Sequence, residues 1–253
     1  MDLGLSGKVA IVTGGAKGIG AGICRCLVQE GATVVVNTHS NDETSQTFCN
    51  ELAKAGTVLP VQGDVSKEDD VFAVFKSAVD TFGRVDILVN NAGITNGYPI
   101  ADMTLAQWRG VLDTNLTGTF LMCREMVRHC RQSQHGGAIV NILSKAAVSS
   151  TTKGRTAYNA SKAGGLGFTK ALAGEVIGDG IRVNGVLPGF VRNSRTDKMF
   201  ETDFEAMEIR RKRLPTQQFG MPEDIGVMAA MLASEKCKLA IGSIVDMTGG
   251  LLL

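Results

Sequence analysis

The sequence has 253 residues, and its 26 lysine and arginine side chains against 25 aspartate and glutamate side chains leave a formal net charge of +1. Hydrophobic residues make up 44% and charged residues 20%, a globular composition that argues against a disordered chain. The near-neutral charge argues against a nucleic-acid binder, and no apolar run approaches the roughly 18 residues that a membrane-spanning helix needs.

Short β-branched runs alternate with helix-length segments along the chain. Near-continuous apolar runs predict strands that are covered on both faces. Strands are expected at 9–12, 33–36, 58–61, 87–89, 138–142, 181–186 and 243–246, and helices at about 17–30, 41–55, 67–82, 105–131, 157–178 and 223–234. This alternation predicts one α/β domain over residues 1–253, with a parallel, doubly wound sheet of about seven strands and helices on both faces.

The stretch at about 189–221 interrupts the alternation, because it is charged and carries no strand pattern. A long insertion after the carboxyl end of a strand is where α/β sheets carry substrate lids, so we expect a lid here. The basic run Arg210 to Arg213 inside it is interpreted as a solvated helix face.

The N-terminal residues and the six cysteines bear on the compartment. Met1 to Lys8 lack the basic and apolar regions of a signal peptide, so we expect a cytoplasmic protein with reduced thiols. With no CxxC pair and only three histidines, the spacing predicts no metal site.

A glycine-rich loop, residues 13–20, joins the first predicted strand to the first predicted helix. Glycines there let the backbone approach a pyrophosphate, whose charge the helix amino terminus stabilises. A tight turn also explains such a cluster, but its place between strand and helix favours a dinucleotide site. The candidate contacts are Gly14, Gly15, Lys17, Gly18, Ile19 and Gly20.

The loop spacing Gly-x-x-x-Gly-x-Gly resembles the short-chain dehydrogenase/reductase family, and further motifs follow in the family's order over essentially the whole chain. They are Asp64-Val65, Asn90-Asn91-Ala92-Gly93, Asn115, Ser144, Tyr158, Lys162, Pro188-Gly189 and Gly249-Gly250. The resemblance implies a Rossmann-like fold and hydride transfer between a nicotinamide and a carbonyl or secondary alcohol. It also implies cofactor contacts at Asp64, Val65, Asn91, Ala92, Gly93, Tyr158, Lys162, Pro188, Gly189, Val191 and Asn193.

Tyr158 and Lys162 lie four residues apart, so a helix places the phenol and the ammonium group on one face. A nearby cation lowers the phenol pKa toward the range needed for general acid–base catalysis. In the reaction that the resemblance implies, Ser144 polarises the carbonyl and Asn115 orders a water chain from Lys162. Ser149 and Ser150 are alternatives to Ser144, and a merely structural polar residue is the alternative for Asn115.

The end of the second predicted strand bears on the choice of nicotinamide cofactor. Relatives that use NAD place an acidic residue there, whereas this chain has Thr38 followed by His39. Lys17 stands where many NADP-dependent relatives carry a base, although a lysine that only faces solvent is the alternative. We therefore favour NADP(H) over NAD(H).

The substrate class stays open between three alternatives. Segments 167–170 and 219–225 resemble 3-oxoacyl-[acyl-carrier-protein] reductases, but Asp179 stands where those enzymes are often basic. A sugar or polyol dehydrogenase is the second alternative, and a non-catalytic NADP-sensing protein is the third. A positive rim predicts an anionic substrate, unless these loop charges are only solvated. The rim residues are Lys145, Lys153, Arg155, Arg192 and Arg195.

The chain carries an apolar C-terminal part, comprising the helix at 223–234, the last strand and Leu251 to Leu253. Relatives build tetramers at this place, and an apolar surface is usually covered by a partner. We expect a homotetramer or homodimer, with packing inside the subunit as the alternative.

Overall fold

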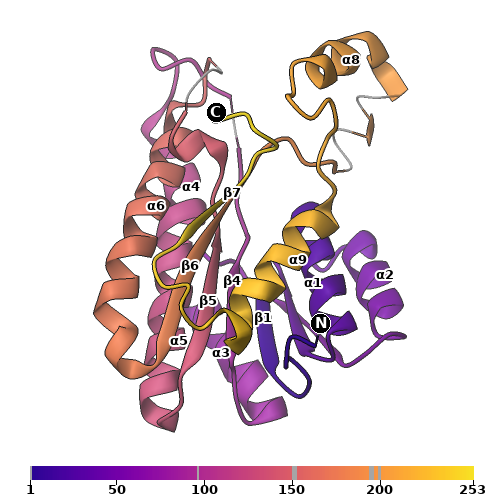
Figure 1. Ribbon diagram of the computed structural model, residues 1–253. Helices are drawn as coiled ribbons and strands as arrows, with labels where there is room; N and C mark the ends of the chain where they lie inside the picture. Colours follow the sequence, from indigo (N-terminus) through magenta and orange to yellow (C-terminus); the bar gives the residue numbers. More distant parts are fainter. Residues whose placement is uncertain (1, 96, 150–152, 194–196, 199–200) are drawn as a thin grey trace.

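The computed structural model describes residues 2–95, 97–149, 153–193, 197–198 and 201–253 (Figure 1). The described residues form a seven-stranded sheet in the order β3-β2-β1-β4-β5-β6-β7, with every neighbouring pair parallel. The predicted doubly wound sheet is thereby confirmed. The strands are β1 Val9–Thr13, β2 Thr33–Thr38, β3 Val58–Gln62, β4 Ile87–Asn90, β5 Gly137–Ile142, β6 Ile181–Pro188 and β7 Ile244–Met247.

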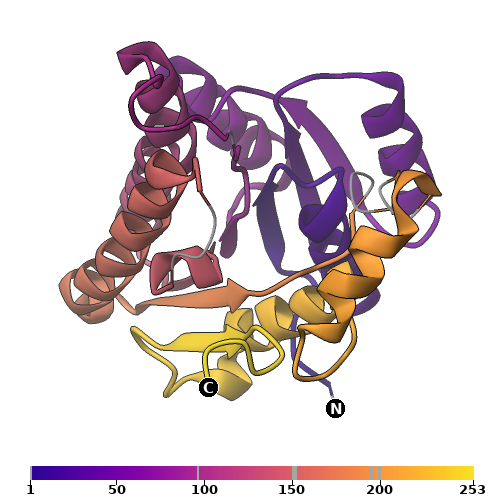
Figure 2. The same cartoon turned by 90° about the horizontal axis from the view of Figure 1, so that it is seen from above.

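Helices cover both faces of this sheet (Figure 2). Side chains alternate along β1, so Ala10 and Val12 pack in one hydrophobic core while Val9 and Ile11 pack in the other. The first core is closed by α1, α2 and α9, and the second by α3, α5 and α6. The helices are α1 Gly18–Gln29, α2 Glu43–Leu52, α3 Glu68–Phe82, α4 Leu105–Leu112, α5 Gly118–Ser133, α6 Thr156–Val176, α8 Phe204–Lys212 and α9 Pro222–Ala233.

The order of the sheet reverses between β1 and β4, since β1 is followed by β2 on one side and β4 by β5 on the other. In open parallel sheets a crevice forms at this point, outside the carboxyl ends of the strands. The glycine loop after β1 and the segment after β4 therefore meet at the place where a ligand is expected.

Two glycines bring α1 and α9 into close contact. A Cβ atom on Gly22 would lie 2.3 Å from the carbonyl carbon of Pro222, and one on Gly226 would lie 2.6 Å from the oxygen of Gly22. The backbones can approach this closely only because both positions lack a side chain. The start of α9 is thereby held against the helix that follows the glycine loop.

Most of the apolar face of α9 packs against the first core inside the subunit. This is the alternative to a partner interface that the sequence left open. Ile225, Ala229 and Leu232 are buried in the first core, and Val227 is the apolar residue of this helix that stays exposed, at 59%. β7 lies at the edge of the sheet with half-buried side chains.

The segment predicted as a lid contains one described helix, α8, at the carboxyl end of the sheet (Figure 1). Val191 and Gly220 form an isolated parallel bridge, which ties the two ends of the segment together. Arg213 is exposed as predicted, whereas Arg210 is half-buried against the ring of Phe190. The prediction of a solvated basic run is therefore wrong for Arg210.

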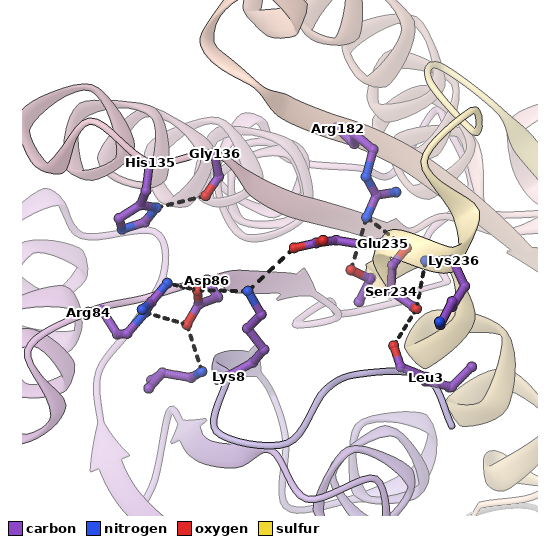
Figure 3. Close-up of polar contacts among 12 residues, drawn as sticks. Leu3, Lys8, Arg84, Asp86, His135, Gly136, Arg182, Ser234, Glu235 and Lys236 are labelled. Atoms are coloured by element: carbon purple, nitrogen blue, oxygen red, sulfur yellow. Dashed lines mark hydrogen bonds and ion pairs between the residues drawn. The ribbon is translucent and has the colours of Figure 1, made fainter. Parts of the chain in front are cut away.

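A network of charged and polar groups lies at the amino ends of the strands, opposite the carboxyl ends where a ligand is expected (Figure 3). The buried carboxylate of Asp86 accepts a hydrogen bond from the backbone of Val9 and pairs with Arg84 and Lys8. The guanidinium of Arg182 donates to carbonyl oxygens at the end of α9, and the hydroxyl of Ser234 donates to the carbonyl of Leu3. The acceptors of Arg182 are Leu232, Ala233, Ser234 and Cys237. Each of these polar groups has a partner inside the subunit, so this part of the molecule has a structural role.

We predict that Arg182→Met lowers the free energy of unfolding by about 2–4 kcal/mol, because partly buried carbonyl oxygens lose a charged donor. Urea denaturation measures the change. Arg128→Met is the control, since Arg128 is exposed and forms a surface ion pair with Glu125, and it should cost less than about 1 kcal/mol. Equal effects of the two substitutions would contradict the prediction.

Candidate active site

The glycine loop leaves the amino terminus of α1 open. Gly14 has a φ of 60°, and a Cβ atom on Gly20 would lie 2.2 Å from the oxygen of Gly14. The loop therefore closes tightly only with glycine at these places. Lys17 precedes the helix but makes no side-chain cap, so the first N–H groups of α1 are available to an anion. A dinucleotide pyrophosphate fits this loop.

The segment after β4 is locked to the glycine loop. The side-chain amide of Asn91 donates to the carbonyl oxygens of Thr13 and Gly14, both at 3.0 Å. The hydroxyl of Thr13 accepts from the backbone N–H groups of Asn91 and Ala92, also at 3.0 Å. These four bonds fix both walls of the crevice relative to each other.

Ser144 and Tyr158 come together at the carboxyl end of β5. Ser144 follows β5, and its hydroxyl accepts from the backbone N–H of Ala146 at 3.1 Å. A hydrogen bond also joins the side chains of Ser144 and Tyr158. Among the alternatives, Ser149 accepts from Asn159 through its backbone oxygen, and Ser150 lies outside the described residues. The geometry favours Ser144 as the partner of the phenol.

Lys162 is buried one helical turn beyond Tyr158. Its Nζ lies 5.9 Å from the centre of the Tyr158 ring and donates to the carbonyl oxygen of Ile142 at 2.8 Å. Burial lowers the pKa of this ammonium group to about 8. The lysine is thus held beside the phenol by the last carbonyl of β5.

The pKa of Tyr158 differs from the expectation of a lowered value. Burial raises it above that of a free phenol, and the hydrogen bond with Ser144 and the charge of Arg155 oppose this rise. Lys162 is not among the groups that lower it, and its ammonium group donates to the carbonyl of Ile142 instead. In this state Tyr158 is a protonated phenol, ready to donate rather than accept.

Asn115 lies in a π-helical turn, Asp113–Thr117, between α4 and α5. Its amide donates to the carbonyl of Ile94 at 2.9 Å and to the hydroxyl of Ser161 at 3.0 Å, and its oxygen accepts from Ile94 N–H at 2.8 Å. A Cβ atom on Gly93 would lie 3.3 Å from the Asn115 oxygen and 3.7 Å from Lys162 Nζ. Asn115 and Lys162 therefore flank Gly93, as a relay between them would require.

Lys17 is paired at the adenosine end of the crevice, a contact that the sequence did not reveal. Its Nζ lies 2.6 Å from the carboxylate of Asp42, which also accepts from Ser40 and caps α2 through Ser45 N–H. The bond from Lys17 lowers the pKa of Asp42 well below its usual range. Thr38 ends β2 without a carboxylate, as expected, but an acid stands four residues later.

Most of the remaining cofactor candidates lie at or just after the carboxyl ends of β2, β3 and β6. His39 is exposed and lies 3.8 Å from Asp64, whose carboxylate accepts from Ser66, while Val65 is buried against Gly118. Pro188 ends β6, and Gly189 N–H donates to Met247. A Cβ atom on Gly18 would lie 3.5 Å from Asn193 Cβ, so the lid segment reaches the glycine loop.

Two further observations concern the described part of the chain. It holds no group of three or more His, Cys, Asp or Glu side chains arranged for a metal ion. None of its helices has the length and apolarity to cross a membrane.

Comparison with known proteins defines the family to which the chain belongs. The sequence profile described as short chain dehydrogenase matches residues 8–203. A 3-oxoacyl-[acyl-carrier-protein] reductase from Thermotoga maritima is 36% identical over 249 residues, 98% of this chain and 99% of the relative. A 3beta-hydroxysteroid dehydrogenase 1 from Eggerthella lenta is 37% identical over 250 residues, 98% of this chain and 95% of the relative.

Comparison with solved structures agrees with the sequence comparisons. A Pseudomonas aeruginosa RhlG/NADP active-site complex has a TM-score of 0.92 at 28% identity and covers 100% of this chain and 99% of its own. A short-chain type dehydrogenase/reductase from Mycobacterium marinum has a TM-score of 0.89 at 31% identity, covering 97% and 96%. The protein is a Rossmann-like oxidoreductase that acts on CH–OH or C=O groups with a nicotinamide cofactor. It belongs to the short-chain dehydrogenase family.

The depressed pKa of Lys162 predicts how stability depends on pH. Between about pH 8 and the ordinary lysine value of 10.5, the unfolded chain binds a proton that the native chain has lost. Stability therefore rises with pH in this window. We expect the difference in unfolding free energy between wild type and Lys162→Met to grow by about 3 kcal/mol across it.

Urea denaturation at a series of pH values measures this difference. Lys170→Met, which changes an exposed lysine on the same helix, is the control and should leave the pH profile unchanged. A constant difference between wild type and Lys162→Met would show that Lys162 keeps an ordinary pKa.

Proposed function

We propose that the protein transfers a hydride between NADP(H) and a carbonyl or secondary alcohol substrate, with Tyr158 as the general acid/base. The observation that carries this proposal is the joining of Ser144, Tyr158 and Lys162 at the crevice beside the glycine loop. A protonated phenol beside a hydroxyl donor suits the reduction direction, because the oxygen of the substrate needs a proton as hydride arrives.

Each side chain has a distinct role in the proposed reaction. Ser144 donates to the substrate oxygen and stabilises the charge that develops there. Lys162 would hold the nicotinamide ribose, and its ammonium group would stabilise the phenolate that forms on Tyr158. Asn115 positions a water path that returns the proton, which fits its placement beside Gly93 and Ser161.

The preference for NADP(H) rests on the adenosine end of the crevice. Thr38 offers no carboxylate to repel a 2′-phosphate, and Lys17 can reach one if it leaves Asp42. The Pseudomonas aeruginosa relative was solved as an NADP complex. The proposed preference therefore depends on exchanging one anionic partner of Lys17 for another.

The proposed substrate is a small molecule rather than one attached to a carrier protein. Arg131 binds the carboxylate of Asp179 through two nitrogens, at 2.8 and 3.0 Å, and this pairing neutralises the positive charge there. An acidic carrier protein would need that charge. Reduction of a 3-oxoacyl group on a carrier protein is the second candidate function, because the relative from Thermotoga maritima is a 3-oxoacyl-[acyl-carrier-protein] reductase.

We also propose that the protein works in the cytoplasm as a homotetramer or homodimer. All six cysteines are free thiols, which suits a reducing compartment. The edge strand β7, the exposed Val227 and the C-terminal Leu253 supply an apolar surface for a second copy.

The catalytic proposal predicts that Tyr158→Phe lowers kcat about 100- to 10,000-fold while NADPH still binds. The loss follows from removing the proton donor without removing the ring. NADPH oxidation with acetoacetyl thioesters and a ketose panel measures turnover, and fluorescence titration measures binding. The matched control is Tyr98→Phe, the other tyrosine, which should keep wild-type activity.

Two outcomes would contradict this assignment. Turnover that survives in Tyr158→Phe would place the acid elsewhere. Tight NADPH binding by the wild type without turnover of any carbonyl would favour the non-catalytic NADP-sensing alternative.

The cofactor proposal predicts opposite effects of two substitutions beside the glycine loop. Asp42→Asn keeps the cap on α2 but frees Lys17, so NADPH should bind about 3- to 10-fold tighter relative to NADH. Lys17→Met should weaken NADPH binding and leave NADH binding unchanged. Fluorescence titration with both cofactors measures this, and wild-type preference for NADH would refute the proposal.

A further inference from the structure

Three cations stand at the substrate side of the proposed site without a carboxylate partner in the part of the chain that the structure describes. Lys145 follows Ser144 directly, Arg155 precedes α6, and Arg210 lies in the last turn of α8. All three are half-buried. Partial burial disfavours a cation unless something nearby offsets its charge.

Lys145 and Arg210 share one aromatic ring. Lys145 Nζ lies 5.1 Å from the ring centre of Phe190, and the guanidinium carbon of Arg210 lies 5.5 Å from the same centre. Phe219 packs edge-on against Phe190, with ring centres 6.5 Å apart. The ring of Phe190 therefore carries two like charges, which repel each other.

Arg155 brings the third charge to the reacting phenol. Its guanidinium carbon lies 6.0 Å from the ring centre of Tyr158, and its charge lowers the pKa of that phenol. Ser144, which binds the same phenol, is the neighbour of Lys145 in sequence. Lys145 and Arg155 are therefore tied to the Ser144–Tyr158 pair, and Arg210 is linked to Lys145 through the ring of Phe190.

Neighbouring basic residues are neutralised in the usual way. Arg192 pairs with Asp197 at 2.7 Å, and Arg211 pairs with Glu208 at 2.8 Å. An acidic partner is thus available along the same segment, and Arg210 nevertheless lies on Phe190 instead. Of the predicted positive rim, Lys145 and Arg155 have no acidic partner among the described residues, Lys153 is exposed, and Arg195 lies outside them.

We infer that the substrate carries its own negative charge, a carboxylate or phosphate group, which binds between Lys145, Arg155 and Arg210. This inference rests on the proposed function and specifies its substrate class as oxo- or hydroxy-acids and sugar or polyol phosphates. An anion there relieves the repulsion between the cations and receives charge-assisted hydrogen bonds. Because Arg210 belongs to α8, the same group would draw the lid segment toward Ser144.

Matched substrate pairs test the inference. Each pair contains the same ketone with and without the charge: 4-oxopentanoate with its methyl ester, and fructose 6-phosphate with fructose. We expect kcat/KM with NADPH to favour the charged member about 10- to 100-fold. A neutral member that is turned over as well as its charged partner overturns the inference and leaves the proposed function standing.

Variants then assign the selectivity to the named residues. Arg210→Met and Lys145→Met should each reduce the ratio of kcat/KM between charged and neutral members about tenfold. Arg213→Met removes an exposed charge from the same segment and should keep the wild-type ratio. Equal ratios in Arg210→Met and Arg213→Met would show that general charge, rather than the pair on Phe190, attracts the anion.

A binding measurement separates this inference from the proposed function. Calorimetric titration with inorganic phosphate should show weaker binding to Arg210→Met and Lys145→Met than to wild type and Arg213→Met. This result supports the anion site even if no pair is turned over, an outcome that would count against the proposed function alone. Phosphate binding that is equal in all four proteins overturns the inference.

Discussion

The interlock between Thr13 and Asn91 is the constraint on which the site depends. Four hydrogen bonds join the end of β1 to the segment after β4, across the point where the order of the sheet reverses. A crevice between two parallel strands would otherwise leave backbone groups unpaired on both walls. Because the amide of Asn91 satisfies the carbonyls of Thr13 and Gly14, the tight turn before α1 is held in place, and the uncapped start of that helix stays available to a ligand.

A second set of buried polar groups links β4, β5 and α6 through hydrogen bonds between side chains. Asn90 donates to the Asn141 side chain at 2.9 Å, and Asn141 donates to Thr169 on α6 at the same distance. Lys162, on the same helix, donates to Ile142 at the end of β5. The helix that carries Tyr158 is thus tied to the strands by polar contacts with fixed direction, which apolar packing alone does not provide.

The architecture could be predicted because its signals are local. Strands buried on both faces need continuous β-branched runs, and Tyr158 and Lys162 share a helix face by spacing alone. What could not be predicted depends on long-range direction. Whether Lys162 Nζ faces the phenol or the carbonyl of Ile142 is decided by where β5 ends, so the expected lowering of the Tyr158 pKa was wrong.

The difference between local signals and long-range contacts also explains the other predictions that succeeded or failed. The sequence predicted a helix at about 41–55, but not that the carboxylate of Asp42 at its start would pair with Lys17. Arg210 was assigned to solvent because a basic run is usually solvated, whereas its position follows from Phe190, which is distant in sequence. The apolar pattern of α9 fits either a partner interface or packing on α1, and the sequence did not reveal that Gly22 and Gly226 bring these two helices together.

The contact between the N-terminal and C-terminal parts of the chain has a consequence for biosynthesis. Ser234 donates to Leu3 across a separation of 231 residues, and α9 completes the packing of α1, the helix that opens the glycine loop. Contacts of such sequence separation form late, after the entropy of a long loop has been lost. A nascent chain therefore emerges from the ribosome with its nucleotide-binding half unfinished, exposing the apolar face of α1 until nearly the whole polypeptide has been made.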